Sequence, residues 1–357
     1  MTTRCSQAFA FFRPDEKLAS LAPLGKGRVN DTWLAETEQG QHYVVQRLNP
    51  TVFPEPALVQ ANLCRVTEHL QNCLVNDHRF KVFQVLSNAT GQTAWLDSDG
   101  AWWRMLSYLD ATQAIEAISE VSQAQAIGTA LGLFHRLLAS LPQPPLADTL
   151  PGFHNTPLYL AKYDALRLTA CLPEVPDCAD FIHARRESMN VLEAARQQGT
   201  ITVQTIHGDP KVGNFLFSQD GAQVISLVDL DTVKPGLLLH DLGDCLRSCC
   251  NTLGEEVTNL AQVLFDQEIF AAVLTGYFSH QTPLLTPEDQ RLLVASAHLI
   301  SLELGLRFYS DYLAGNCYFK VDHPEQNLFR ARVQFALVRS IENQYSELLA
   351  IAARCAA

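Results

Sequence analysis

The sequence has no pair of cysteines spaced as CxxC, although it contains ten cysteines in 357 residues. Their positions form no repeated framework, so neither a zinc site nor a disulfide scaffold is predicted. No apolar run is long enough to span a membrane, since the most apolar stretch, 292–306, includes His298 and Glu303. The apolar patch near the N-terminus ends at Arg13, too early for a signal peptide. We therefore expect reduced thiols and a cytoplasmic protein with no membrane partner.

Positive charge is in deficit. The sequence has 26 Lys and Arg residues against 38 Asp and Glu residues, a net charge of −12. A surface of this sign repels phosphate backbones, so nucleic acid is not an expected partner. A small anion in a local basic or metal-lined pocket is still compatible with it. Apolar residues make up 47% of the chain, too many for a disordered protein.

The apolar pattern divides the chain into a strand-rich beginning and a helical remainder. Before residue 109, short β-branched runs alternate with turns, and one helix is expected over 58–70. After it, helical spacing dominates, with helices expected at 124–141, 158–168, 181–197, 260–278, 292–313 and 328–353. We therefore predict a small N-terminal lobe, 1–108, and a larger helical lobe, 109–357.

One short strand-like insert interrupts the helical part and carries the most informative polar residues. Two apolar runs, 215–217 and 224–228, flank a polar turn and predict a β-hairpin. Asp209, Asn214 and Asp229 each lie at the end of a strand or apolar run. A rigid backbone at these positions can direct each side chain into a cleft.

Phosphoryl transfer requires side chains of these types. One carboxylate orients the attacking hydroxyl and accepts its proton, and we assign this role to Asp209. A carboxylate and an amide oxygen are suitable ligands for Mg²⁺, which indicates Asp229 and Asn214. Asp-x₄-Asn with a further Asp after the next strand is the spacing of kinase-like catalytic loops.

Other interpretations of this cluster stay open, because Asp and Asn also cap turns and helices. Asp231 is as compatible with a loop cap as with a second metal contact. Lys211 is as compatible with a solvated side chain as with a phosphate contact. Asp241 and Asp244 are expected to cap a helix and brace the hairpin, and His207 to hydrogen-bond beneath the loop.

A phosphatase is a rival interpretation. The run 228–233 matches the DxDx[TV] motif of haloacid-dehalogenase-type phosphatases, in which Asp229 would become a phospho-aspartate and Asp231 the acid/base. That family carries the motif on the first strand of a parallel α/β sheet. Here it follows a hairpin, and no β–α alternation comes after it, so the sequence favours a kinase.

The same residues resemble the aminoglycoside phosphotransferase and choline kinase superfamily. His207-Gly208-Asp209 with Asn214 resembles its catalytic loop, and Asp229-Leu230-Asp231 resembles its metal motif. Within the superfamily, the chain is most similar to bacterial N-acetylhexosamine 1-kinases. The similar segments cover nearly the whole chain, at 25–33, 43–49, 52–54, 154–157, 229–236, 240–244, 305–319 and 323–328.

The resemblance implies an α+β, protein-kinase-like two-lobed fold, with a small antiparallel β-sheet lobe that binds ATP and a larger, mainly helical lobe that holds the catalytic loop and a sugar site. It implies that Asp209 is the base toward the sugar's anomeric hydroxyl. The implied Mg²⁺ ligands are Asn214, Asp229 and Asp231. The implied nucleotide contacts are Gly25, Gly27, Asn30, Gln46, Arg47 and Tyr108. The implied substrate contacts are Lys211, Arg307, Tyr318 and His154.

The chain departs from the common kinase pattern on its third strand. Many kinases place a Lys or Arg there, ion-paired to a helix Glu. Gln46 and Arg47 occupy this place, and strand alternation lets only one of them face the nucleotide. The helix offers Glu68, and Cys64 is an alternative occupant of the usual Glu position.

Together these features predict a monomeric ATP-dependent kinase that phosphorylates the anomeric hydroxyl of GlcNAc or GalNAc. Arg307 and Tyr318 favour a neutral sugar, because a guanidinium and a phenol can hydrogen-bond its hydroxyls or acetamide. The alternatives to substrate binding are a structural ion pair for Arg307 and an interfacial position with a satisfied hydroxyl for Tyr318. Kinases of aminoglycosides, choline or homoserine, and a catalytically silent ligand-binding relative, are the other candidate functions.

Overall fold

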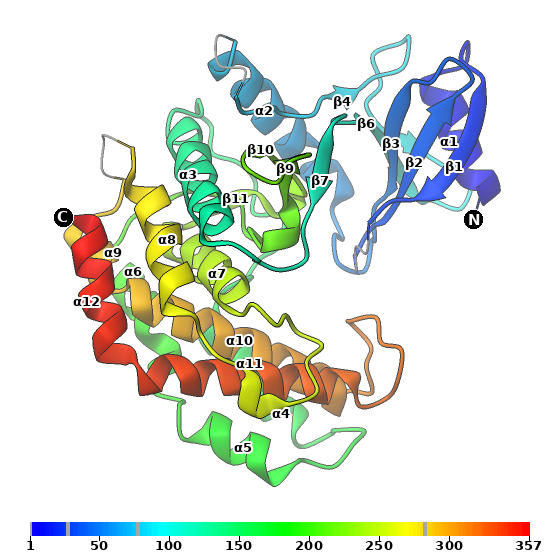
Figure 1. Cartoon of the computed structure of the whole chain (residues 1–357). Helices are drawn as coiled ribbons and strands as arrows, with labels where there is room; N and C mark the ends of the chain where they lie inside the picture. Colours follow the sequence, from blue (N-terminus) through cyan, green and yellow to red (C-terminus); the bar gives the residue numbers. More distant parts are fainter. Residues whose placement is uncertain (1, 26–28, 76–78, 281–283) are drawn as a thin grey trace.

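The computed structural model describes residues 2–25, 29–75, 79–280 and 284–357. Figure 1 shows an antiparallel β-sheet region from the first part of the chain, at the upper right, beside a region made mainly of helices. The protein therefore has the expected mixed α+β fold. The predicted boundary after residue 108 stays a prediction. Among the described residues, no helix combines the length and apolarity that a membrane crossing requires.

The N-terminal sheet has the strand order β1-β2-β3-β6-β4, and β5 pairs with β6. Its strands are β1 (Leu18–Pro23), β2 (Asp31–Thr37), β3 (His42–Arg47), β4 (Val85–Leu86), β5 (Trp95–Leu96) and β6 (Trp102–Ser107). Because strand side chains alternate between faces, Val45, Trp103 and Met105 pack together with helix α1 (Thr2–Phe12). The opposite face carries Gln46 and Arg104, which are register partners.

Helix α2 (Pro56–Cys73) joins the sheet to the rest of the molecule. Pro at its first turn suits the helix start, and Leu63 and Val66 enter the main core with Leu106 of β6. From the same buried part of α2, the Asn62 side-chain amide donates to the Val233 carbonyl oxygen at 3.2 Å. The helix therefore contacts both the sheet and the insert that carries the predicted site.

The helical region is built around close helix pairs, notably α3 against α8 and α10 against α7 and α11. At the α3–α8 crossing, a Cβ on Gly128 would lie 1.9 Å from the Val273 carbonyl oxygen, and one on Gly276 would lie 2.0 Å from that of Gln125. Larger residues would force these helices apart. The helices are α3 (Val121–Leu138), α4 (Thr156–Leu166), α5 (Pro176–His183), α6 (Val191–Gln197), α7 (Leu238–Cys250), α8 (Gln267–Phe278), α9 (Pro287–Arg291), α10 (Leu293–Leu313), α11 (Gln326–Asn343) and α12 (Tyr345–Ala356).

The insert forms two small antiparallel sheets, β10-β9-β7 and β11-β8. Strands β9 and β10 are the predicted hairpin, and β8 pairs with β11. Short 3-10 turns, η2 (Val212–Asn214) and η3 (Leu230–Thr232), follow the predicted catalytic and metal positions. The strands are β7 (Thr112–Ala114), β8 (Val203–Ile206), β9 (Phe215–Ser218), β10 (Val224–Leu227) and β11 (Lys234–Leu237).

Two helices predicted as continuous are broken. The helix expected over 181–197 is divided between α5 and α6, with η1 (Ser188–Asn190) between them. The helix expected over 328–353 breaks at Gln344, whose side chain donates to the Phe265 carbonyl oxygen at 2.7 Å. The long stretch 260–278 is also shorter, because η4 (Leu260–Gln262) precedes α8. Contacts distant in sequence override local periodicity here.

Candidate active site

The loop after β8 is held from beneath by Asp241 of α7. The backbone N–H groups of His207 and Gly208 each donate to the Asp241 carboxylate at 2.7 Å, and the His135 ring lies 2.8 Å from it. Gly208 has φ +90°, and a Cβ there would lie 2.7 Å from the Thr232 carbonyl oxygen. These constraints fix the backbone that presents Asp209, in agreement with the bracing role expected for Asp241.

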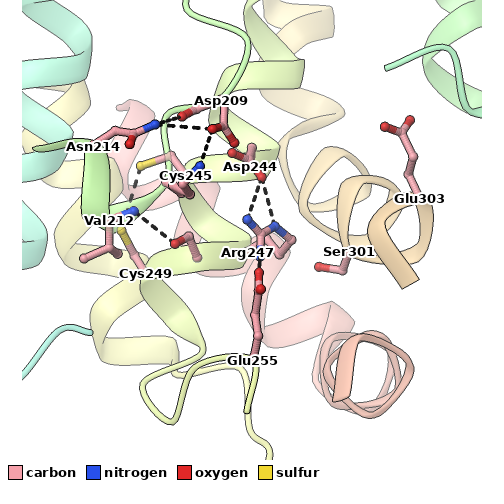
Figure 2. Close-up of polar contacts among 12 residues, drawn as sticks. Asp209, Val212, Asn214, Asp244, Cys245, Arg247, Cys249, Glu255, Ser301 and Glu303 are labelled. Atoms are coloured by element: carbon pink, nitrogen blue, oxygen red, sulfur yellow. Dashed lines mark hydrogen bonds and ion pairs between the residues drawn. The ribbon is translucent and has the colours of Figure 1, made fainter. Parts of the chain in front are cut away.

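Asp209 lies beside Lys211 and Asn214, as Figure 2 shows for Asp209 and Asn214. The Asn214 amide donates to the Asp209 backbone carbonyl at 2.7 Å, and the Lys211 ammonium contacts the Asp209 carboxylate. Burial raises the pKa of Asp209, but the charge of Lys211 more than offsets this, so the pKa is below its ordinary value. The carboxylate is therefore ionised at neutral pH and can accept a hydrogen bond from a hydroxyl.

Asp229 follows β10 in a left-handed backbone conformation, with φ 66°, which costs a non-glycine residue roughly 1 kcal/mol or more. The residue is exposed by surface area, but desolvation by the surrounding protein raises the pKa of its carboxyl group; Lys211 opposes this rise, whereas Asp231 and Asp209 add to it. The strained turn thus presents a carboxylate that a nearby cation would stabilise.

Asn214 and Asp229 fit a hard divalent cation. The Val228 N–H donates to the Asn214 backbone carbonyl at 2.9 Å, which links the two segments, and the Asn214 amide nitrogen faces Asp209. The described residues contain no cluster of three His, Cys, Asp or Glu side chains around one point. One carboxylate and one amide oxygen are nevertheless a suitable set for Mg²⁺, which is commonly bound by one or two carboxylates plus substrate phosphates.

Asp231 is differently placed from Asp229. It is 2% exposed, and both of its carboxylate oxygens contact the N-terminal sheet region. Arg104 lies 2.7 Å from one oxygen and donates to the other at 2.9 Å, and the Asn30 amide donates at 2.6 Å. The predicted metal contact of Asp231 stays a prediction.

The two candidates on the third strand lie on opposite faces of the sheet. Gln46 accepts a hydrogen bond from Arg104 at 2.9 Å and donates to Thr32 at 3.1 Å, on the face toward α2. Arg47 instead pairs with Asp31 of β2. Gln46 is therefore the one that shares a network with Asp231.

The other predicted nucleotide residues are separated along the sheet region. The Asn30 side-chain oxygen accepts from the Asn49 N–H at 3.0 Å. Gly25 has φ +73°, which suits a turn, and Gly27 lies outside the described residues. Tyr108, after β6, packs its ring edge-on against His42 at 5.5 Å. Their contacts with a nucleotide stay predictions.

Arg307 of α10 lies among aromatic rings. Its guanidinium carbon is 5.1 Å from the centre of Phe153, 5.2 Å from Tyr159 and 6.0 Å from Tyr318. Burial lowers its pKa, but the tyrosines and the charges of Glu303 and Asp209 raise it above the ordinary value. Phe319 is a fourth ring near the guanidinium, at 5.6 Å.

Tyr318 lies in the loop after α10, and it is 45% exposed. Asp311 shapes this loop: its carboxylate accepts from the backbone N–H groups of Cys317, Tyr318 and Phe319 at 2.8–2.9 Å. Sequence reasoning assigned no role to Asp311. An Asp in the last turns of a helix before Gly315 was the available signal.

His154 is almost fully buried, and both ring nitrogens have protein partners. One lies 3.0 Å from the Glu303 carboxylate and the other 2.8 Å from the Gly208 carbonyl oxygen. Burial lowers its pKa, but Glu303 more than compensates and raises it. In this structure His154 supports the catalytic loop, so its predicted substrate contact stays a prediction.

A groove of about 910 Å³ lies elsewhere, between α5 and α11, and contains none of the predicted site residues. Phe181 and Phe335 stack on its wall, 4.6 Å apart. The catalytic interpretation therefore rests on the chemistry and geometry of the insert and not on the size of a cavity.

The chain belongs to the phosphotransferase enzyme family, whose model matches residues 20–273. It is a small-molecule phosphotransferase with an alcohol group as acceptor. This assignment removes the phosphatase alternative, in agreement with the antiparallel hairpin that precedes Asp229.

Solved structures of small-molecule kinases are similar over nearly the whole chain. An amicoumacin kinase in complex with AMP-PNP, Ca²⁺ and Ami has a TM-score of 0.64 at 16% identity, with 96% of this chain and 93% of that chain covered. A microcompartment-associated aminopropanol kinase has a TM-score of 0.58 at 15% identity, with 98% of each chain covered. A choline kinase from Streptococcus pneumoniae has a TM-score of 0.55 at 17% identity, with 96% and 99% covered. At these identities the likeness establishes the fold and leaves the acceptor open.

Proposed function

We propose that the chain is an ATP-dependent kinase that uses Mg²⁺ and phosphorylates the anomeric hydroxyl of an N-acetylhexosamine, such as GlcNAc or GalNAc. The observation that carries the acceptor class is Arg307, a guanidinium held among aromatic rings. One of these rings, Phe153, precedes His154, whose ring contacts the Gly208 carbonyl oxygen next to Asp209. Use of ATP is supported by family membership and by similar kinases, one of them in complex with AMP-PNP.

The acceptor hydroxyl would lie against Asp209. Its carboxylate orients the hydroxyl and takes up the proton as the oxygen bonds to the γ-phosphorus, and ADP leaves with the bridging oxygen. The lowered pKa of Asp209 makes it a weak base, which suits a reaction in which positioning and charge neutralisation supply most of the rate. Lys211, which pairs with Asp209, would contact the transferred phosphate.

Asn214 and Asp229 would hold Mg²⁺, which supplies neutralisation of the phosphate charge. Gly25 and Asn30 would lie near the phosphates, and Tyr108 would lie near the base. Asp229 is exposed and therefore accessible to a cation, and a bound cation would offset the repulsion from Asp231 and Asp209 that helps to raise its pKa.

The charge of Arg307 argues against a cationic acceptor. A quaternary ammonium or a protonated aminoglycoside would meet a second positive charge close to its binding site, at a cost that protein surroundings do not fully screen. A neutral sugar can instead accept hydrogen bonds from the guanidinium, and the rings of Tyr159 and Tyr318 can cover a pyranose face.

The test is ADP release with Mg·ATP against a panel of N-acetylhexosamines, other free sugars, aminoglycosides, choline, homoserine and amino alcohols. Phosphorus NMR of the product locates the new phosphate. We expect an N-acetylhexosamine 1-phosphate. Preferential phosphorylation of choline or an amino alcohol would reject the sugar acceptor and keep the phosphotransferase, and binding of Mg·AMP-PNP without any turnover would favour a catalytically silent protein.

A further inference from the structure

The cation that faces the insert from the N-terminal sheet comes from β6 and not from the third strand. Gln46 on β3 is directly opposite Arg104 on β6 and Thr32 on β2, so the three side chains share one face. Gln46 carries no charge and holds the Arg104 guanidinium at 2.9 Å. Arg104 is therefore oriented by the residue that replaces the usual lysine.

Helix α2 offers Arg104 no carboxylate. Glu68 on this helix is exposed. Cys64 lies one turn earlier; burial raises the pKa of its thiol, and the charge of Arg104 partly opposes this rise. The partner of Arg104 is Asp231, 127 positions further along the chain, in the turn η3. Many kinases have an ion pair between a third-strand Lys or Arg and a helix Glu. Here the ion pair is Arg104–Asp231, which joins the sheet to the catalytic insert.

The contact is a buried ion pair with one hydrogen bond, from Nη2 of Arg104 to one Asp231 oxygen, and a second close approach between Nη1 and the other oxygen. Two guanidinium nitrogens of Arg104 lie 2.7 and 2.9 Å from the two Asp231 oxygens, and the two side chains are 2% and 1% exposed. Asn30 donates to the same carboxylate at 2.6 Å. Desolvating two charges is expensive, and such a pair is often no more stabilising than apolar residues of the same volume. Stability alone is therefore a poor explanation for it.

The position of Asp231 connects this pair to the chemistry. It lies two residues after Asp229, on the other side of the left-handed turn that presents the Asp229 carboxylate. Holding Asp231 from the sheet side fixes that turn and the distance between Asn30, just before β2, and the insert. The nucleotide and its metal ion would have to fit between these two elements.

We propose that the Arg104–Asp231 pair positions the nucleotide site, so that Asp231 acts as a positioning residue rather than as a metal ligand. The pair holds the sheet over the insert and sets the orientation of Asp229. This inference rests on the proposed function only for its use of Mg·ATP, and it is independent of the acceptor.

A double-mutant cycle on Mg·AMP-PNP binding by calorimetry tests the proposal, with the full chain and no acceptor. R104M, D231N and the double variant are each expected to raise the dissociation constant by a similar factor, about tenfold, because all three lose the same contact. Kinetics should show the same rise in the KM for ATP. R104K should lie between the wild type and R104M, since an ammonium keeps the positive charge but cannot also reach Gln46, to which the Arg104 Nε–H donates.

Two results would overturn the proposal. If Asp231 binds the metal directly, D231N raises the half-saturating Mg²⁺ concentration while R104M, which frees the carboxylate, leaves it equal or lower. If the residues act independently, the double variant weakens binding by the product of the single effects, about a hundredfold.

A second variant protects the test against misfolding, because each single substitution leaves a buried charge without its partner. R104M/D231M removes both charges and is expected to recover most of the melting temperature that the single substitutions lose. It should still bind Mg·AMP-PNP as weakly as they do. Wild-type affinity in this variant would reject the positioning role.

The control is the Arg185–Glu342 pair, another Arg–carboxylate ion pair, with hydrogen bonds of 2.8 and 2.7 Å, which lies in the helical region and is partly exposed. R185M/E342Q is expected to lower the melting temperature and to leave Mg·AMP-PNP affinity unchanged. A wild-type protein that does not bind Mg·AMP-PNP would overturn both this inference and the proposed nucleotide use. A wild type that binds it but phosphorylates no sugar would reject only the acceptor.

Discussion

Two layers of polar residues meet at the insert, and they differ in what their side chains have left to bind. The first is named the exposed layer after Asp229, which is exposed, and Asp209, which is partly exposed, and it also contains the buried Asn214. The pKa values of its two carboxyl groups are shifted in opposite directions. The layer beneath it contains two buried pairs, His135–Asp241 and His154–Glu303. The two residues of each pair contact each other, and each pair is hydrogen-bonded to the loop backbone at Gly208. Carboxylates with oxygen atoms still free to bind and with opposed pKa shifts are suited to catalysis. Side chains whose polar atoms are already hydrogen-bonded are suited to holding the loop in place.

D209N is the strongest test of the exposed layer. The amide keeps the shape of the side chain but cannot take up a proton, so we expect turnover to fall by about 10³-fold. The melting temperature and Mg·AMP-PNP affinity should change little, because the side chain is partly exposed and its backbone is held by Asp241. Steady-state kinetics and calorimetry provide the measurements. Wild-type turnover in D209N would remove Asp209 from the mechanism.

D241N tests the supporting layer. An amide nitrogen would face a backbone N–H that now has a carboxylate oxygen at 2.7 Å. We expect the free energy of unfolding to fall by about 3 kcal/mol, with a smaller loss of turnover as the loop shifts. Chemical denaturation and kinetics measure the two effects.

Asp289 provides the control for D241N, because it is also a buried Asp that accepts a backbone N–H, from Thr286 at 2.9 Å, but it lies in α9. D289N should destabilise the fold and leave turnover of the remaining folded protein intact. Equal losses of turnover in D241N and D289N would show that the supporting layer has no special link to the loop.

R307M separates acceptor binding from nucleotide binding. Losing a charged hydrogen-bond donor should raise the KM for the acceptor by about tenfold to a hundredfold, while Mg·AMP-PNP affinity is unchanged. R339M is the matched control, since Arg339 also lies over an aromatic ring, Phe181 at 5.0 Å, outside the catalytic cluster. If only the KM for ATP rose, Arg307 would contact the nucleotide and not the acceptor.

The comparison also shows what the sequence could predict. The strand-rich beginning, the helical remainder and the β9–β10 hairpin follow from local periodicity and turn residues, and the structure confirms them. The spacing of Asp209, Asn214 and Asp229 identified the exposed layer because these residues are close in sequence. Their roles stay predictions, although the structure brings Asp209 and Asn214 into contact.

Contacts between distant segments could not be predicted in this way. Arg104 is one cation in an apolar strand, and nothing near it in the sequence indicates Asp231. His154 is similar, because its partners Gly208 and Glu303 come from an insert and a helix far along the chain. Gln344 breaks a periodic helix through a bond to Phe265. Local sequence patterns identify the candidate catalytic residues, whereas the residues that hold them in place are seen only in the folded structure.

The smallest predicted effect comes from outside both layers, at Glu342 of α11. Burial raises its pKa, but His298 and Arg185 lower it from 4.5 to about 2. Since the folded-state pKa is depressed, the pair stabilises the fold above pH 4.5, and this contribution is lost as pH falls toward 2. The full shift corresponds to about 3 kcal/mol, and because 33% of the side chain is exposed, we expect about 1 kcal/mol.

E342Q should therefore unfold more easily than wild type at pH 7 and equally easily near pH 2 in urea titrations, with turnover at pH 7 unchanged. A constant difference across this pH range would contradict the assignment, and a loss of turnover would mean that the catalytic insert depends on more of the helical region than its supporting layer.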